Sequence, residues 1–143
     1  MDGRPHVALT VTDIGRSVDF YRAFFGQEPM KRETGYAKFS LSNPSLNLSL
    51  NLVERVAPAD GVSHFGVEVA SSEAVAAMRE RVVGAGLGVR DERDVTCCYA
   101  RQDKFWVRDP DGREWEVFTV LEDMPYHSDA APERDCCAAD CCS

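Results

Sequence analysis

One pattern occurs twice in this chain: an alternating strand with a histidine near its start, followed by an amphipathic helix. Residues 6–13 alternate apolar with polar side chains, and residues 14–26 repeat apolar positions at helical spacing. Residues 63–70 alternate in the same way, and residues 71–86 again carry a helical apolar stripe that ends in glycines. Superposing the two strands also aligns the two helices. The sequence therefore predicts an internal repeat of architecture.

Three extended pieces follow each predicted helix. In the first half they cover 28–33, 36–41 and 46–54, and in the second half 87–95, 102–108 and 113–122. The last two pieces of the second half are joined by DPDG, a strong hairpin turn.

The pattern predicts an α+β fold with two βαβββ modules. We place the modules at about 5–56 and 62–121, with a linker at 55–61. Together they form one domain over residues 1–122, and residues 123–143 are expected to be a flexible, cysteine-rich tail.

Composition limits the classes of partner. Hydrophobic residues make up 44% of the 143 residues and charged residues 28%, which is typical of a soluble globular domain. No apolar run approaches the roughly 18 residues of a membrane span. A net charge of −8 argues against nucleic acid and anionic membranes as partners. Because the start of the chain reaches charged residues too early for a signal peptide, we expect a cytoplasmic protein with reduced thiols.

His6, His64 and Glu116 are candidate metal ligands. The two histidines occupy matching positions of the two modules, and Glu116 lies in an apolar strand where a carboxylate needs a partner. Two imidazoles and one carboxylate form the facial triad of non-haem Fe(II) chemistry, and with a bound water they also suit Zn(II) hydrolysis. Strand histidines more often have an ordinary hydrogen-bonding role, but the joint placement favours metal binding.

Cys97 and Cys98 are neighbours in the chain. Their Cα atoms lie only about 3.8 Å apart, which suits a disulfide poorly. Two adjacent thiolates can instead converge on one soft, thiophilic atom. The alternative is a pair of small, half-buried hydrophobic residues.

Four further cysteines lie near the end of the chain: Cys136, Cys137, Cys141 and Cys142. They are candidates for capturing soft metal ions. The alternative is a reactive chain end without a function.

Four stretches of the sequence resemble the vicinal oxygen chelate superfamily. They are the strand of His6, the helix with DFYRAFFG, the strand SHFGVEV and the ending DPDGREWEVF. The superfamily includes glyoxalase I, extradiol dioxygenases and fosfomycin-resistance thiol transferases, and the resemblance covers roughly residues 5–121. Within it, the adjacent cysteines and the cysteine-rich tail are similar to the organoarsenical C–As lyases, some of which are known as cadmium-induced proteins.

The resemblance implies a fold, a reaction and a set of ligands. The two modules would pair in a half-open, barrel-like mixed sheet around a metal site, within one chain or exchanged between chains, as a monomer or homodimer. The reaction would use Fe(II) and O2 to remove the methyl or aryl group from a trivalent organoarsenical and leave arsenite. His6, His64 and Glu116 would hold the iron, and Cys97 and Cys98 would bind the arsenic.

Other members of the superfamily fit less well. Glyoxalase I uses a fourth, carboxylate ligand late in the first module, where this chain offers Asn47, Ser49 and Asn51 but no acid before Glu54. A metal-dependent thiol transferase of the fosfomycin-resistance type shares the two histidines and the glutamate but has no use for adjacent thiols. A non-enzymatic protein that binds cadmium or arsenic through its thiols is the remaining alternative.

Overall fold

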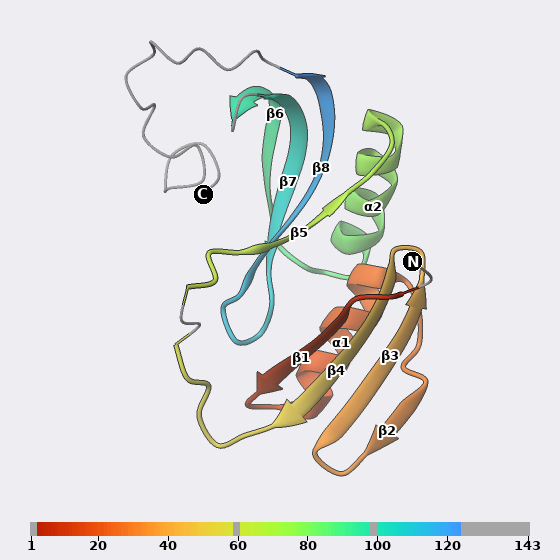
Figure 1. Ribbon diagram of the computed structural model, residues 1–143, viewed down its shortest axis with the longest axis vertical. Coiled ribbons are helices and arrows are strands. Elements are labelled where there is room, and N and C mark those ends of the chain that lie inside the picture. The colour runs from red at the N-terminus through yellow and green to blue at the C-terminus, as the bar shows by residue number, and fades with distance from the viewer. Residues whose placement is uncertain (1–2, 59–60, 98–99, 124–143) are drawn as a thin grey trace.

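A computed structural model describes residues 3–58, 61–97 and 100–123. These residues form a repeated βαβββ order (Figure 1). The elements are β1 (His6–Val11), α1 (Ile14–Phe25), β2 (Lys31–Glu33), β3 (Tyr36–Ser42), β4 (Ser45–Leu52), β5 (Phe65–Glu68), α2 (Ser72–Gly84), β6 (Val89–Cys97), β7 (Ala100–Arg108) and β8 (Glu114–Asp123).

Each module builds its own four-stranded mixed sheet. The strand orders are β1-β4-β3-β2 and β5-β8-β7-β6, so the two sheets have the same topology. The first strand of each module pairs in parallel with the last strand, and the other pairs are antiparallel. The predicted α+β fold of two βαβββ modules is confirmed. The strands form two separate sheets and no closed barrel in the described part of the chain.

Local sequence signals begin and end the helices. The Asp13 carboxylate accepts a hydrogen bond from the backbone N–H of Arg16 at 3.0 Å, which caps the start of α1. Gly26 ends α1 in the left-handed backbone conformation, with φ 68°, which residues that have a Cβ rarely adopt. Ser71 caps α2 in the same way as Asp13 caps α1, by accepting from the N–H of Ala74 at 3.1 Å.

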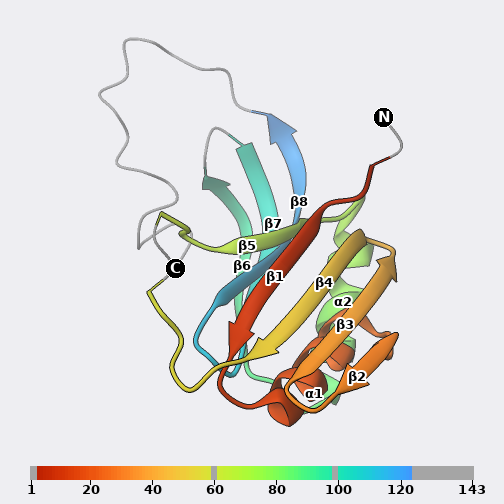
Figure 2. The same cartoon turned by 60° about the horizontal axis from the view of Figure 1, so that its bottom comes forward.

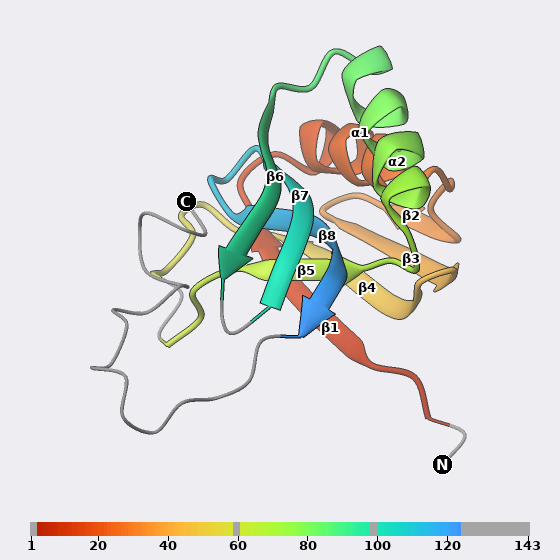
Figure 3. The ribbon, with the colours of Figure 1, turned by 90° about the horizontal axis from the view of Figure 1, so that it is seen from above.

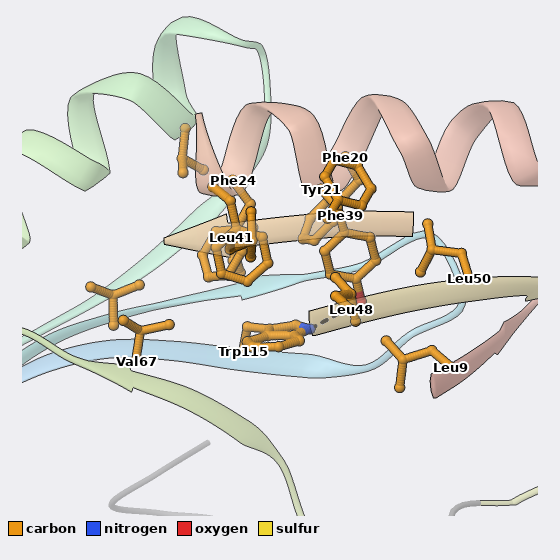
Figure 4. Packing of buried hydrophobic residues seen from close by; sticks show 14 of the residues in the cluster. Leu9, Phe20, Tyr21, Phe24, Phe39, Leu41, Leu48, Leu50, Val67 and Trp115 are labelled. Carbon is orange, nitrogen blue, oxygen red and sulfur yellow. Dashed lines mark hydrogen bonds between the residues drawn. The ribbon is translucent and has the colours of Figure 1, made fainter. Parts of the chain in front are cut away.

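The core lies between the helices and the sheets, and it is shared by both modules. Trp115 of β8 packs against the buried aromatic face of α1 (Figure 4). Its ring centroid lies 5.4 Å from that of Phe24 and 5.7 Å from that of Phe25. Because these rings come from different modules, the two halves bury apolar surface against each other.

A buried hydrogen-bond network joins the modules beside this aromatic cluster. The Tyr21 hydroxyl donates to Asp109 Oδ2 at 2.6 Å and accepts from Trp115 Nε1 at 3.1 Å. Asp109 opens the DPDG turn between β7 and β8, and Oδ1 accepts from the backbone N–H groups of Asp111 and Arg113. The predicted hairpin turn is therefore present, and the carboxylate of Asp109 also binds α1 through the Tyr21 hydroxyl.

Several element boundaries differ from the sequence prediction. β2 covers only 31–33, because its charged side chains are exposed at the sheet edge. β5 begins at Phe65, so His64 precedes the strand. β6 covers 89–97 in place of the predicted 87–95, and its pairing with β7 continues to Cys97. The predicted tail beyond Asp123 lies outside the described residues. Within the described residues, no helix is long and apolar enough to cross a membrane.

Candidate metal site

The second module brings two of the three predicted ligands together. β5 and β8 pair in parallel with Gly66 opposite Glu116, so the residue just before β5 lies beside the Glu116 side chain. His64 Nε2 lies 3.4 Å from Glu116 Oε1, and the two side chains are 18% and 12% exposed. The two side chains are thus largely shielded from solvent but still accessible to a small ligand.

The separation of these two atoms fits ligation of one metal ion. A value of 3.4 Å is longer than a good N–H···O hydrogen bond. Two donor atoms that each lie about 2.1 Å from one metal ion are roughly 3.0 Å apart at a right angle and roughly 3.4 Å apart at a tetrahedral angle. The residues present therefore suit a divalent ion such as iron, manganese or zinc.

Both predicted histidine ligands engage Nδ1 locally. Asn47 O lies 3.1 Å from His6 Nδ1, and since a carbonyl oxygen only accepts, His6 Nδ1 carries the proton. The Ser63 hydroxyl lies 3.0 Å from His64 Nδ1. In each case the contact orients the ring and leaves Nε2 for a metal ion, as partners of ligating histidines commonly do.

His6 does not join the pair in this chain. No group of three or more His, Cys, Asp or Glu side chains able to hold a metal ion occurs among residues 3–58, 61–97 and 100–123. The directions of the strands give the reason. β1 starts on the side of the molecule where the N-terminus lies, whereas β5 starts on the opposite side, beside the linker (Figures 1 and 3).

The first module has no acid at the position equivalent to Glu116. Ala8 of β1 pairs with Ser49 of β4, as Gly66 of β5 pairs with Glu116 of β8. Ser49 is buried, at 5% exposure. A glyoxalase-like carboxylate ligand is therefore absent from this position of the structure.

Three residues beside the pair were not predicted from the sequence: Gly66, Lys104 and Trp106. Lys104 Nζ forms an ion pair with Glu116 Oε2 at 3.4 Å, and its side chain is only 1% exposed. The Trp106 ring contacts the His64 ring edge-on, with centroids 5.0 Å apart. A lysine inside the apolar strand DKFWV was the available signal, because a buried ammonium requires a partner.

Cys97 lies at the other end of the second sheet from Glu116. Cys97 is the last residue of β6 and pairs with Ala100 of β7, which in turn pairs with Asp123 of β8. Asp123 follows Glu116 by seven positions along β8, or about 23 Å at 3.3 Å per residue. Cys98 and the four tail cysteines lie outside the described residues.

Two irregularities bend the sheet between Glu116 and Cys97. The register shifts between Glu92 and Val95 in the β6–β7 ladder, and between Arg101 and Gln102 in the β7–β8 ladder. Such bulges increase twist and redirect a hairpin. The end of β6 curves accordingly in Figure 1.

His64 also lines a cleft of about 360 Å³ between the linker and the β7–β8 turn. Its walls include Val56, Val62, Phe65 and Arg113. This volume is in the range of small-molecule sites. A small substrate could therefore approach the imidazole from this side.

Two repeated βαβββ modules with a histidine–glutamate pair define a glyoxalase-fold protein with a candidate metal site. The chain belongs to the Glyoxalase/Bleomycin resistance protein/Dioxygenase superfamily, whose family model matches residues 3–117. The resemblance inferred from the sequence is thus confirmed.

Curated relatives within the superfamily are more specific. The chain is 44% identical to a "Trivalent organoarsenical cleaving enzyme" of Bacillus sp. (strain MD1), over 96% of this chain and 89% of the relative. It is 38% identical to an enzyme of the same name from Thermomonospora curvata, over 97% and 99%. It is also 41% identical to "Cadmium-induced protein CadI" of Mycobacterium bovis, over 97% and 92%.

Solved structures share the fold. A glyoxalase/bleomycin resistance protein/dioxygenase from Alicyclobacillus acidocaldarius superposes with a TM-score of 0.70 at 16% identity, over 85% of this chain and 93% of that one. A glyoxalase-related enzyme from Fulvimarina pelagi superposes with a TM-score of 0.61 at 24% identity, over 83% and 88%. At these identities the likeness concerns the fold alone.

Proposed function

We propose that this protein is an Fe(II)- and O2-dependent C–As lyase that removes the methyl or aryl group from trivalent organoarsenicals and releases arsenite. The observation that carries the proposal is the 3.4 Å approach of His64 Nε2 to Glu116 Oε1. It occurs in a chain 44% identical to a relative named for cleaving trivalent organoarsenicals.

His64 and Glu116 would hold the metal ion, with His6 as third ligand. His6 would reach the pair through a different packing of the two modules or from a second copy of the chain. The ion supplies redox-active chemistry toward O2 when bound. The surrounding residues hold the ligands: Ser63 contacts one ring, and Lys104 contacts the carboxylate.

Cys97 and Cys98 would bind the arsenic. Trivalent arsenic is soft, and thiolates are the protein ligands that such atoms prefer. Two sulfurs on arsenic leave its organic group as the third substituent. For that group to approach His64 and Glu116, the bulged β6–β7 hairpin has to bend back over the sheet. Holding the C–As bond near the metal ion in this way would be the proximity contribution to catalysis.

The test is oxygen uptake by the protein with Fe(II) and methylarsonous acid. We expect uptake with release of arsenite. Cys97→Ser and Cys98→Ser should abolish binding of the organoarsenical but leave iron loading unchanged, and His64→Ala should do the reverse. If both classes of variant still demethylate the substrate, the proposed roles are wrong.

Two alternatives give different outcomes in the same assay. A thiol transferase of the fosfomycin-resistance type predicts Mn(II) dependence, no oxygen uptake and no effect of Cys97→Ser. A soft-metal-binding protein is favoured by the relatives named for induction by cadmium. It predicts stoichiometric binding of Cd(II) or As(III) through the cysteines, without turnover and without iron.

A further inference from the structure

The Glu116 side chain passes closely over the backbone of β5. A Cβ placed on Gly66 would lie 2.8 Å from Glu116 Cγ and 3.3 Å from Oε1. The first distance is shorter than real Cβ contacts, so any larger residue at position 66 would displace the carboxylate. The backbone of Gly66 has no positive φ, so the requirement for glycine comes from this contact.

The two oxygens of the same carboxylate have different neighbours. Oε1 lies 3.4 Å from His64 Nε2, and Oε2 lies 3.4 Å from Lys104 Nζ. Lys104 is in β7 and its side chain is 1% exposed, so its ammonium is shielded from solvent beside Oε2. Its position beside Trp106, 5.7 Å from the ring centroid, limits its movement further.

We propose that Gly66 and Lys104 position Glu116 so that it offers only one oxygen, Oε1, to the metal ion. This inference rests on the proposed function, because it takes His64 and Glu116 as ligands. Gly66 leaves room for the Glu116 side chain over β5, and Lys104 forms an ion pair with Oε2 while Oε1 lies near His64.

A carboxylate can bind a metal ion through one oxygen or through both. Binding through both would occupy a further coordination position, and fewer positions would remain open to water or other small ligands. Lys104 is therefore a positioning residue: it acts through Glu116 and keeps a coordination position open.

The charge of Lys104 makes the inference testable by sign. An ammonium near a divalent cation opposes metal binding, and it also withholds Oε2. Removing it should therefore tighten metal binding while reducing the number of open positions. If the lysine only supported the fold, its removal would loosen the site and weaken metal binding.

Mn(II) serves as the probe, because free Mn(II) gives an electron paramagnetic resonance signal and bound Mn(II) relaxes the protons of its exchangeable water. For Lys104→Met we expect a Kd for Mn(II) lower by about tenfold or more, with about one fewer exchangeable water on the bound ion. Lys104→Arg, which retains the charge, should bind Mn(II) like the wild type. Lys31→Met, in the exposed strand β2, is the matched control for loss of a lysine.

Gly66→Ala tests the other contact without changing any charge. Its Cβ displaces Glu116, and we expect the Kd for Mn(II) to rise about 10–100-fold, as when a metal ligand loses its support. Gly84→Ala is the matched control, since a Cβ there meets no atom within 4 Å. The two substitutions at the site therefore shift the Kd in opposite directions.

The results separate this inference from the proposed function. If His64→Ala binds Mn(II) like the wild type, the metal site itself is wrong. If His64→Ala loses Mn(II), but Lys104→Met weakens binding or leaves the hydration unchanged, the positioning role is wrong. Should Lys104→Met fail to fold by circular dichroism, Gly66→Ala decides, and a Kd like that of the wild type overturns the inference.

Discussion

The hydroxyl of Tyr21, in the first module, hydrogen-bonds Asp109 and Trp115 of the second module. Burial raises the pKa of its hydroxyl well above the ordinary value near 10, and the neighbouring carboxylate of Asp109 raises it further. In the unfolded chain the same hydroxyl ionises near pH 10. The folded state therefore retains a proton that the unfolded state loses, and this contribution to stability decreases as the pH rises above about 10.

We expect Tyr21→Phe to act in two ways. At pH 7 the free energy of unfolding should fall by about 1–3 kcal/mol, because Asp109 and the Trp115 N–H lose a buried partner. Above pH 10 the variant should lose stability less steeply than the wild type. Urea unfolding between pH 7 and pH 11 measures both effects.

Tyr36→Phe is the control, since the half-buried Tyr36 hydroxyl has no hydrogen bond among the described residues. It should change the free energy of unfolding by less than about 0.5 kcal/mol. An equal loss of stability in both variants would show that the hydrogen bonds around Asp109 contribute no more to the free energy of unfolding than an unbonded tyrosine hydroxyl does.

The site residues were predictable from the sequence only in part. His64 and Glu116 were identified because matching strand positions and an apolar strand context restrict where such side chains point. Gly66 and Lys104 were not identified, because their roles depend on a close approach across the β5–β8 pair that no spacing in the chain reveals. Whether His6 lies beside His64 and Glu116 depends on the relative direction of β1 and β5, and the repeat alone does not determine this direction.

At the scale of elements, the second helix secures the end of the first. Arg81 of α2 donates to the carbonyl of Phe24 at 2.7 Å and to that of Ala23 at 3.1 Å. These carbonyls lie in the last turn of α1, where no further helical N–H is available. A cation is also favourable at this end of a helix dipole.

Arg81→Met should therefore lower the free energy of unfolding by about 1–2 kcal/mol. The methionine keeps most of the aliphatic volume, so the loss reports the hydrogen bonds and the charge. Arg16→Met, on the exposed first turn of α1, should have an effect below about 0.5 kcal/mol. Thermal and urea unfolding of both variants measure the difference, and equal effects would contradict a specific role for Arg81.

The elements themselves were predicted well, since alternation and helical spacing respond to the same burial that the fold imposes. Both helices, the β1, β3 and β4 strands and the DPDG turn lie where the sequence placed them. The errors fall at ends and edges. β2 is shorter because an exposed, charged edge strand gains little from pairing. β6 lies two residues later than predicted because bulged pairing continues through polar residues.

At the scale of the molecule, the modules share one core around Trp115. Figure 2 shows α1 of the first module and α2 of the second next to each other behind β3 and β4. Thr12 donates to Asp111 at 2.6 Å, and Arg113 donates to the carbonyl of Thr10 at 2.6 Å, so the β7–β8 turn also holds the end of β1. These contacts predict that the modules unfold together.

The chain has two tryptophans, which allows a direct test. In Trp115→Phe, Trp106 is the remaining tryptophan, and its fluorescence reports the second module alone. We expect its unfolding transition in urea to coincide with that of the far-ultraviolet circular dichroism, which reports both modules. A dichroism change that precedes the fluorescence change would contradict a shared core.

The aromatic contact between Trp115 and α1 also limits how such a chain can change over generations. Each half displays the same order of elements, so a duplicated gene segment is a natural origin for it. Because Trp115 of the second half packs on α1 of the first, the two halves are not interchangeable. Replacing a single half would therefore pair that ring with a helix whose surface was not selected to fit it, and we expect such a replacement to destabilise the fold.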